Sequence, residues 1–267
     1  MTYPTPPALK DPAFSGGPSS APVAPAPAPP SLLQRIRRFP ATFALIGITV
    51  LVFAAQWLGQ SLLGADVVLY YGAKINERLA AGEAWRLVTP VFLHAGLLHI
   101  GVNMYSLYAL GPAVERFFGR GRFLVVYLLA GTSGVLLSLV MSPSPSVGAS
   151  GAIFGLLGAL AAFLYLHRAT FGQLGAMQLR QLVFVALINL GLGLSPGIDN
   201  WGHVGGLLAG AGLAWFIGPR FVTHMLPDGR PRLVDQRPKQ QVSVRLALAV
   251  LAVAGLSILA MMNARGA

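Results

Sequence analysis

Residues 148–166 read GASGAIFGLLGALAAFLYL, an apolar stretch without a charged residue that opens on a Gly-Ala-Ser-Gly tetrapeptide. The serine of this tetrapeptide is Ser150, and His203 stands near the start of another apolar stretch about 50 residues later. Polar and ionisable side chains are costly at bilayer depth, so such a pair needs an explanation. A nucleophile and the base that activates it provide one.

Seven apolar blocks of this kind occur along the chain. Of the 267 residues, 55% are hydrophobic and only 10% are charged, whereas a soluble domain carries about a quarter charged residues. A membrane span needs roughly 20 apolar residues, so we predict an all-α polytopic membrane protein. The blocks cover residues 41–63, 95–113, 123–141, 150–166, 181–196, 202–218 and 244–262.

The placement of the basic residues predicts an orientation in the membrane. The chain has a net charge of +11, and 15 of its 19 lysines and arginines flank the blocks on one side. The positive-inside rule then puts the N-terminus in the cytoplasm and the C-terminus outside. The charge thus indicates topology and contact with the lipid bilayer rather than a nucleic-acid partner. The four basic residues on the outer side are Lys74, Arg78, Arg86 and Arg265.

Two absences narrow the compartment. The first apolar block begins only at Ala41, so we expect it to remain as an anchor and expect no cleavable signal peptide. The N-terminus also lacks the Arg-rich amphipathic pattern of a transit peptide, which favours a bacterial inner membrane over an organelle. The chain has no cysteine, which excludes disulfides, cysteine catalysis and thiolate metal sites.

The blocks divide the chain into four segments. Residues 1–40 hold 11 of the 20 prolines and are predicted to form a disordered cytoplasmic tail, with a docking role for Pro25 to Pro30 as the alternative. Residues 41–218 form a core of six helices, residues 219–243 a basic cytoplasmic linker, and residues 244–267 an additional transmembrane helix with a short outer tail. The long outer loop 64–94 is expected to be functional or partly structured.

The predicted topology brings polar residues of three helices to one depth. The second, fourth and sixth spans all begin at the outer face, and their first turns carry His99 and Asn103, Ser150, and His203, respectively. At about 1.5 Å of rise per residue, all four lie in the outer half of the bilayer. Base activation requires Ser150 and His203 to approach within about 2.6–3.2 Å.

Glycines on the fourth and sixth spans permit this approach. Small residues at helical spacing let two backbones come close together. Ordinary helix packing explains the same pattern, but close approach is also what the chemistry needs. The glycines are Gly151, Gly155 and Gly158 on one span and Gly202, Gly206 and Gly210 on the other.

His99 and Asn103 are four residues apart and therefore share one face of their helix. Both can donate a hydrogen bond, as can the backbone N–H of Ser150 at a helix N-terminus. Donors directed at a developing oxyanion contribute about 3–4 kcal/mol each in acyl transfer. The alternative is that the two side chains merely bond each other or a neighbouring helix.

Taken together, these motifs resemble those of the rhomboid intramembrane serine proteases, over about residues 40–218. The resemblance implies a rhomboid-like six-helix bundle, to which the last block adds a seventh, C-terminal transmembrane helix. It rests on Trp85-Arg86 in the first outer loop, His94-x4-His99-x3-Asn103, Gly148-Ala149-Ser150-Gly151 and Gly202-His203-x2-Gly206.

The resemblance also implies a role for each motif. Ser150 would be the nucleophile and His203 the general base and acid, without a cofactor or a metal. His99, Asn103 and the Ser150 N–H would form the oxyanion hole. Phe154 stands where many members have a tyrosine that stacks on the catalytic histidine. Supporting positions are Gly148, Gly151, Gly202 and Gly206, and Trp85 and Arg86 would order the first outer loop at the membrane interface.

Three further ionisable residues have simpler expected roles. His94, just before the second span, is expected to close a loop. Asp199 is four residues before His203 and could orient its imidazole, although the resemblance implies a dyad without an acid. Glu115, at the cytoplasmic end of the second span, is expected to pair with nearby arginines.

The implied activity is that of a serine endopeptidase acting on transmembrane protein substrates close to the outer face. Preferred substrates should carry small or helix-breaking residues, because an intact helix hides its carbonyl groups in hydrogen bonds. The main alternative is a catalytically silent rhomboid-like protein that binds membrane clients. A metalloprotease would need the motif His-Glu-x-x-His, which is absent. An aspartyl protease would need two carboxylates within the apolar blocks, which contain none. A transporter is compatible with hydropathy alone.

Overall fold

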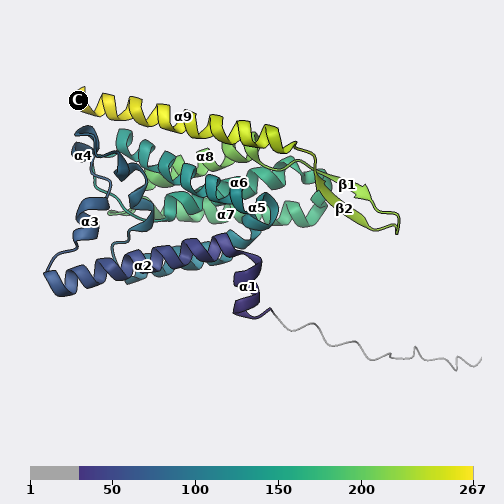
Figure 1. The fold of residues 1–267 in the computed structure, drawn as a ribbon, viewed down its shortest axis with the longest axis horizontal. Helices are drawn as coiled ribbons and strands as arrows, with labels where there is room; N and C mark the ends of the chain where they lie inside the picture. Colours follow the sequence, from purple (N-terminus) through teal and green to yellow (C-terminus); the bar gives the residue numbers. More distant parts are fainter. Residues whose placement is uncertain (1–29, 267) are drawn as a thin grey trace, which may run out of the picture.

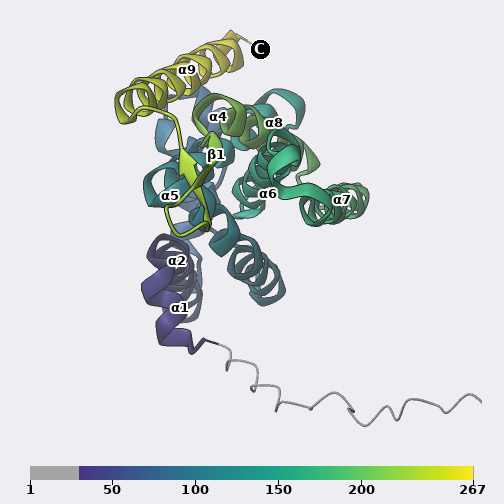
Figure 2. The same cartoon turned by 90° about the vertical axis from the view of Figure 1, so that its right-hand side faces the viewer.

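The computed structural model describes residues 30–266, most of which are helical (Figure 1). In Figures 1 and 2, α2 and α9 lie along opposite sides of a bundle that contains α5, α6 and α8. Most of the predicted proline-rich tail, residues 1–29, lies outside the described residues. The elements are α1 (Leu32–Arg38), α2 (Pro40–Leu63), α3 (Val67–Gly72), α4 (Asn76–Ala80), two 3-10 turns (Ala84–Leu87 and Thr89–Phe92), α5 (Leu97–Met141), α6 (Ser150–Leu166), α7 (Arg168–Leu192), α8 (Asn200–Ile217), β1 (Phe221–Met225), β2 (Pro231–Asp235) and α9 (Lys239–Gly266).

Several of these helices are suited to a bilayer. Within residues 30–266, four of them, α2, α5, α7 and α9, are long and apolar enough to cross a membrane, and α6 is a shorter apolar helix of 17 residues. The first apolar block, predicted over 41–63, coincides with α2. The prediction of a mostly helical chain with several apolar spans is therefore confirmed.

The predicted second and third blocks fall within one element, α5. Its backbone leaves the helical region at Gly119, where φ is 75° and ψ is 163°, a conformation that favours glycine. Before this turn, Glu115 bonds Thr42 at the start of α2. After it, Ser138 accepts a hydrogen bond from Lys74, which follows α3 at the other end of α2. The two halves of α5 therefore run in opposite directions.

Glu115 caps α2 instead of pairing with an arginine, so that prediction is wrong. Its carboxylate accepts hydrogen bonds from the N–H groups of Ala41 (3.1 Å) and Thr42 (2.8 Å) and from the Thr42 hydroxyl (2.7 Å). The first N–H groups of a helix lack helical partners and carry partial positive charge. The residue before α2 is Phe39, whose side chain cannot accept a hydrogen bond. A distant glutamate therefore takes the capping position.

Glycines bring α6 and α8 into backbone contact. A Cβ atom at Gly206 would overlap the carbonyl oxygen of Gly151, and one at Gly210 would overlap that of Gly155. On α5, a Cβ atom at Gly134 would lie 2.5 Å from the carbonyl oxygen of Gly202. The predicted close approach of these two spans is thus confirmed, and α5 joins them.

The bounds predicted for the fifth span, 181–196, are wrong. The observed helix, α7, covers Arg168–Leu192 and departs from helical backbone at Gly172. Polar residues in its first half, among them Gln178 and Arg180, lower the local hydropathy and hide the helix from a search for apolar blocks. Figure 2 shows α7 at the edge of the bundle, and its described buried residues are Gly175 and Ala186.

Two elements lie in segments for which no regular structure was expected. The predicted linker 219–243 contains an antiparallel hairpin in which Phe221 of β1 faces Asp235 of β2. The end of the predicted tail forms α1, which begins with a reciprocal pair of hydrogen bonds between Ser31 and Gln34. The hairpin lies at the end of the bundle opposite α3 and α4 (Figure 1).

Candidate active site

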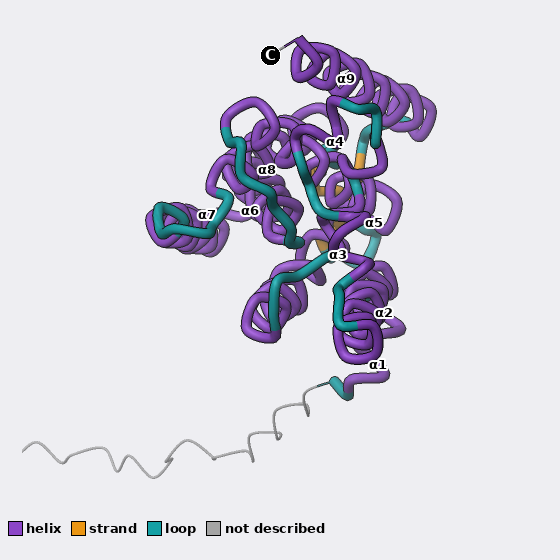
Figure 3. Tube along the Cα trace, turned by 90° about the vertical axis from the view of Figure 1, so that its left-hand side faces the viewer, coloured by secondary structure: helices purple, strands orange, loops and turns teal. Residues whose placement is uncertain are grey.

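Ser150 and His203 meet at the N-terminal ends of α6 and α8. Ser150 is the first residue of α6, and His203 lies in the first turn of α8. His203 Nε2 is 2.9 Å from Ser150 Oγ, within the reach required for a base to take the hydroxyl proton. The two helices begin at the end of the bundle where α3 and α4 lie. Figure 3 views the bundle from this end.

An aromatic ring, and not a carboxylate, supports the His203 imidazole. The Phe154 ring is stacked on it, with centroids 4.5 Å apart and an interplanar angle of 11°. Asp199 Oδ1 instead accepts the N–H of Gly202 at 3.0 Å and caps α8. His203 Nδ1 is buried and has no hydrogen-bond partner among the described residues. Among the described residues, no carboxylate is therefore hydrogen-bonded to the His203 imidazole.

The His99 side chain lies beside the backbone that leads into Ser150. Gly148 has a φ of 133°, and a Cβ atom there would lie 2.8 Å from His99 Nε2. Glycine is therefore required at position 148 both by its backbone conformation and by the imidazole next to it. His99 Nδ1 accepts the N–H of Ala95 at 3.4 Å, which leaves the proton on Nε2 and makes this atom a donor.

Asn103 is one turn further along α5 and is buried, with 5% of its surface exposed. Its Nδ2 donates to the backbone oxygen of His99 at 2.9 Å. One of its two amide protons is thus used within α5, and the second remains for another acceptor. At α6, no side chain of the described residues caps the first turn, so the Ser150 N–H is one of the groups that a helix leaves without a partner.

His94 links three segments around the site. Its backbone N–H and carbonyl are bonded to the side chain of Gln56 at 3.0 and 3.1 Å. Its Nε2 lies 3.5 Å from the N–H of Ala149, the residue before the serine. The structure agrees with the expectation that His94 closes a loop. Gln56 was not recognised from the sequence, although an amide side chain within an apolar block is a signal for such a partner.

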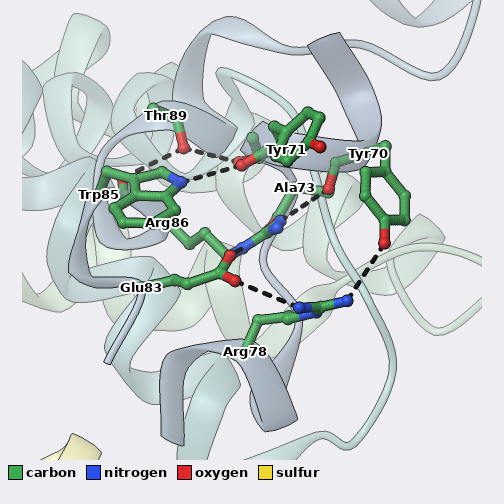
Figure 4. A network of polar contacts seen from close by, with 9 residues as sticks. Tyr70, Tyr71, Ala73, Arg78, Glu83, Trp85, Arg86 and Thr89 are labelled. Atoms are coloured by element: carbon green, nitrogen blue, oxygen red, sulfur yellow. Dashed lines mark hydrogen bonds and ion pairs between the residues drawn. The ribbon is translucent and has the colours of Figure 1, made fainter. Parts of the chain in front are cut away.

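Trp85 and Arg86 fasten the long segment between α2 and α5 (Figure 4). The Arg86 side chain is only 1% exposed, and it bonds Glu83 at 2.6 Å and the carbonyl oxygen of Ala73 at 2.7 Å. Trp85 remains half-exposed while its Nε1 donates to the carbonyl oxygen of Tyr71 at 2.9 Å. Both residues thus join two stretches of the loop, about residues 70–73 and 83–89.

Lys74 holds the segment that precedes Ser150, a role that the sequence analysis missed. Its side chain is fully buried, and Nζ donates to the carbonyl oxygens of Ser138 (3.2 Å), Ser142 (2.8 Å) and Ser144 (2.9 Å). Its backbone pairs with Ser146 in a short antiparallel bridge. Burial lowers the pKa of Lys74, an effect that Asp199 and Glu77 oppose. A buried cation among carbonyl groups therefore fixes both the end of α5 and the loop toward α6.

Replacing Lys74 by methionine should lower the free energy of unfolding by about 3 kcal/mol, because the carbonyl groups of Ser138, Ser142 and Ser144 all lose a charged donor. Thermal unfolding in detergent measures this change. Lys239→Met provides a matched control, since Lys239 is exposed at the start of α9, and should change stability by at most about 0.5 kcal/mol. Equal stability of the two variants would contradict the assigned role.

A cavity of about 30 Å³ adjoins the dyad and is lined by Ser150, His203, Gly148, Ser146 and Asp199, among others. A cavity needs roughly 10–15 Å³ to hold one water molecule, so a water molecule fits beside Ser150. Over residues 30–266, no group of three histidine, aspartate or glutamate residues is placed to hold a metal ion.

Comparison with known proteins gives one family. The family model described as the Rhomboid domain matches residues 81–220. The chain is 42% identical over 171 residues to Rhomboid protease GluP of Bacillus subtilis (strain 168). This stretch covers 63% of this chain and 33% of that protein. It is 35% identical over 179 residues to RHOMBOID-like protein 9, chloroplastic, of Arabidopsis thaliana, covering 65% of this chain and 40% of that protein. The chain thus spans well under half the length of these relatives.

The fold and the comparisons together define a multi-pass, mostly helical membrane protein that is homologous to serine proteases. The chain belongs to the rhomboid family. The resemblance seen in its motifs is thereby confirmed.

Proposed function

We propose that this chain is an intramembrane serine endopeptidase that uses Ser150 and His203 as a dyad. The observation that carries the proposal is the 2.9 Å approach of His203 Nε2 to Ser150 Oγ. In the first half of the reaction, Oγ attacks the carbonyl carbon of a substrate peptide bond while Nε2 takes the hydroxyl proton. The imidazolium then gives this proton to the leaving amine, and the acyl chain stays on the serine.

In the second half, water releases the acyl chain. His203, again neutral, takes a proton from a water molecule whose oxygen attacks the ester, and it returns the proton to Ser150 Oγ. The cavity beside the dyad supports this step because it has room for a water molecule. While His203 is charged, the stacked Phe154 ring offers a cation–π contact of about 0.5–2 kcal/mol in place of a carboxylate.

The oxyanion of each tetrahedral intermediate would be bound by three donors. These are His99 Nε2–H, the free amide proton of Asn103 and the N–H of Ser150. Support comes from the Nδ1 acceptor contact of His99, which leaves Nε2 protonated, and from the burial of Asn103 next to it. Loss of one such donor from an acyl-transfer site raises the activation free energy by about 3–4 kcal/mol.

The membrane arrangement follows the sequence prediction. We propose a six-helix core over residues 41–218, in which α5 supplies two passes, and α9 as a seventh span after the linker 219–243. The N-terminus would be cytoplasmic, the C-terminus outside, and the membrane a bacterial inner membrane. The hairpin, whose strand β2 contains Arg232, lies opposite α3 and α4 (Figure 1), which supports placing the dyad near the outer face.

Substrates would be transmembrane segments of other proteins, cleaved in or near the membrane close to the outer face. A helix conceals its carbonyl groups in hydrogen bonds, so segments with glycine or proline should be cleaved in preference to a polyleucine helix. Equal cleavage of the two kinds of segment by the purified chain would contradict this part of the proposal.

A fluorescent fluorophosphonate tests the dyad directly. The wild-type chain in detergent is expected to be labelled and to cleave a designed transmembrane substrate, whereas Ser150→Ala should do neither. Ser106→Ala is a matched control, because Ser106 is partly exposed on α5 and its hydroxyl bonds only its own helix backbone in the described structure. Labelling that persists in Ser150→Ala would refute the assignment of the nucleophile. A folded wild-type chain that is neither labelled nor active would instead support the client-binding alternative.

A further inference from the structure

An apolar groove lies where α9 packs against the core. It has a volume of about 520 Å³ and runs between α8 and α9, with Ser133 of α5 at its base. Its walls are formed by Ala209, Gly212 and Phe216 on α8 and by Leu248 and Ala252 on α9. A Cβ atom at Gly212 would meet no described atom within 4 Å. The groove is therefore a space that the protein leaves open, unlike the tight contact between α6 and α8.

Contacts at both ends of α9 hold the groove open. At one end, Arg265 Nε donates to the carbonyl oxygen of Ala80 at 2.6 Å, and Met261 packs near Leu79. At the other end, the guanidinium groups of Arg237 and Arg245 both donate to the carbonyl oxygen of Phe216. Since α9 is fastened at its two ends, the space between them cannot be closed by a simple shift of the helix.

The end of the groove at Phe216 and Leu248 carries an excess of positive charge. Arg245 lies over the Phe216 ring, 5.5 Å from its centroid, one turn before Leu248 in the groove wall. Arg237 is 92% buried, yet its Nε has no hydrogen-bond partner among the described residues. Arg122 and Arg220 lie nearby, and Asp235 bonds both the Arg122 side chain at 2.6 Å and the Arg220 backbone N–H at 2.9 Å.

We call these four residues the arginine cluster (Arg122, Arg220, Arg237 and Arg245). Their guanidinium groups repel one another. Burial, followed by the charges of Arg245, Arg220 and Arg122, lowers the pKa of Arg237 to about 10. Among residues 30–266, Asp235 supplies the one carboxylate bonded to these four arginines. The cluster thus lacks negative charge at the place where the apolar groove begins.

We infer that the groove and the arginine cluster form a binding site for an anionic glycerophospholipid, with an acyl chain in the groove and the phosphate at Arg245 and Arg237. Each half of the site matches one half of this ligand. A zwitterionic lipid would fill the groove but bring no net negative charge to the arginines, and a free phosphate would leave the groove empty. Cytoplasmic leaflets supply anionic lipids, and each nearby arginine contributes about 1 kcal/mol to their binding.

Lipid binding by the purified, delipidated full chain tests the inference without reference to protease activity. Native mass spectrometry with phosphatidylglycerol should show saturable binding that is stronger than that of phosphatidylcholine. Arg245→Gln should weaken phosphatidylglycerol binding about fivefold. Arg232→Gln removes the same charge from an exposed site on β2 and should leave the affinity unchanged.

A second pair of variants tests the groove itself. Gly212→Leu places a side chain in the open space and should weaken binding about tenfold or more, because several acyl methylene groups lose their place. Gly255→Leu is the matched control on α9, since its Cβ atom would also meet no described atom within 4 Å and it is not part of the groove wall. Unaltered thermal unfolding in the absence of lipid would show that both variants fold.

Three outcomes would overturn the inference. One is equal binding of phosphatidylcholine and phosphatidylglycerol, and another is saturable binding of glycerol phosphate with the same affinity as the lipid. The third is an unchanged lipid affinity in Gly212→Leu, which would leave the groove to another occupant, such as a transmembrane helix. None of these results bears on whether Ser150 is labelled by a fluorophosphonate.

Discussion

A His203→Ala variant is expected to cleave a designed transmembrane substrate about a million-fold more slowly than the wild-type chain, the size of loss seen when a serine hydrolase loses its base. Alanine leaves the Ser150 hydroxyl without the acceptor that now lies 2.9 Å away. No other side chain of the described residues is hydrogen-bonded to Ser150 Oγ, so no second base is in place to take its proton. Single-turnover cleavage in liposomes measures the effect, and labelling by a fluorophosphonate should be lost in parallel.

Asp199→Asn is the matched control for this prediction. The amide oxygen of asparagine can still accept the N–H of Gly202 and cap α8, as Asp199 does at 3.0 Å. If the dyad acts without an acid, this variant should keep its rate to within a few fold. A loss comparable to that of His203→Ala would show instead that the Asp199 carboxylate takes part in the reaction.

Gly206→Ala is expected to destabilise the protein by about 3 kcal/mol or more, a large value for a single methyl group. The added Cβ atom would overlap the carbonyl oxygen of Gly151, which is backbone and cannot rotate aside. The helices α6 and α8 must then separate, and since His203 is one turn from Gly206, it should move away from Ser150. Thermal unfolding in detergent and fluorophosphonate labelling should both report the change.

Gly212→Ala, on the same helix, is expected to change the stability in the opposite direction. A Cβ atom there meets no described atom within 4 Å, and alanine is favoured over glycine in a helix by up to about 1 kcal/mol. We therefore expect unchanged or higher stability and normal labelling. If both alanine variants behave alike, the α6–α8 contact is not as tight as the structure shows.

The sequence predicts those features that rest on the position of residues along one helix. Apolar length located α2, and glycine spacing indicated that α6 and α8 approach closely, although the pairing of Gly206 with Gly151 came from the structure. The proximity of Ser150 and His203 followed from topology, because both stand at the start of spans that begin on the same side. These are local patterns, and each is decided by a residue and its near neighbours.

Features that depend on a distant partner were not predictable in this way. Glu115 was assigned to arginines because they are close in sequence, whereas its partners lie at the start of α2. Lys74 was read only as a charge on the outer side, and nothing near it reveals that three carbonyl groups surround Nζ. The bounds of α7 were wrong because an average of hydropathy cannot separate a polar helical turn from a loop.

The Glu115 contact also sets an order of events during synthesis. Ala41 precedes Glu115 by 74 residues, so α2 leaves the ribosome and enters the membrane well before its cap exists. Until the first half of α5 has been inserted, the N–H groups of Ala41 and Thr42 must be solvated by water or lipid headgroups. We therefore expect the start of α2 to stay in contact with water or lipid headgroups while the chain grows, and its cap to form only once the first half of α5 is in place.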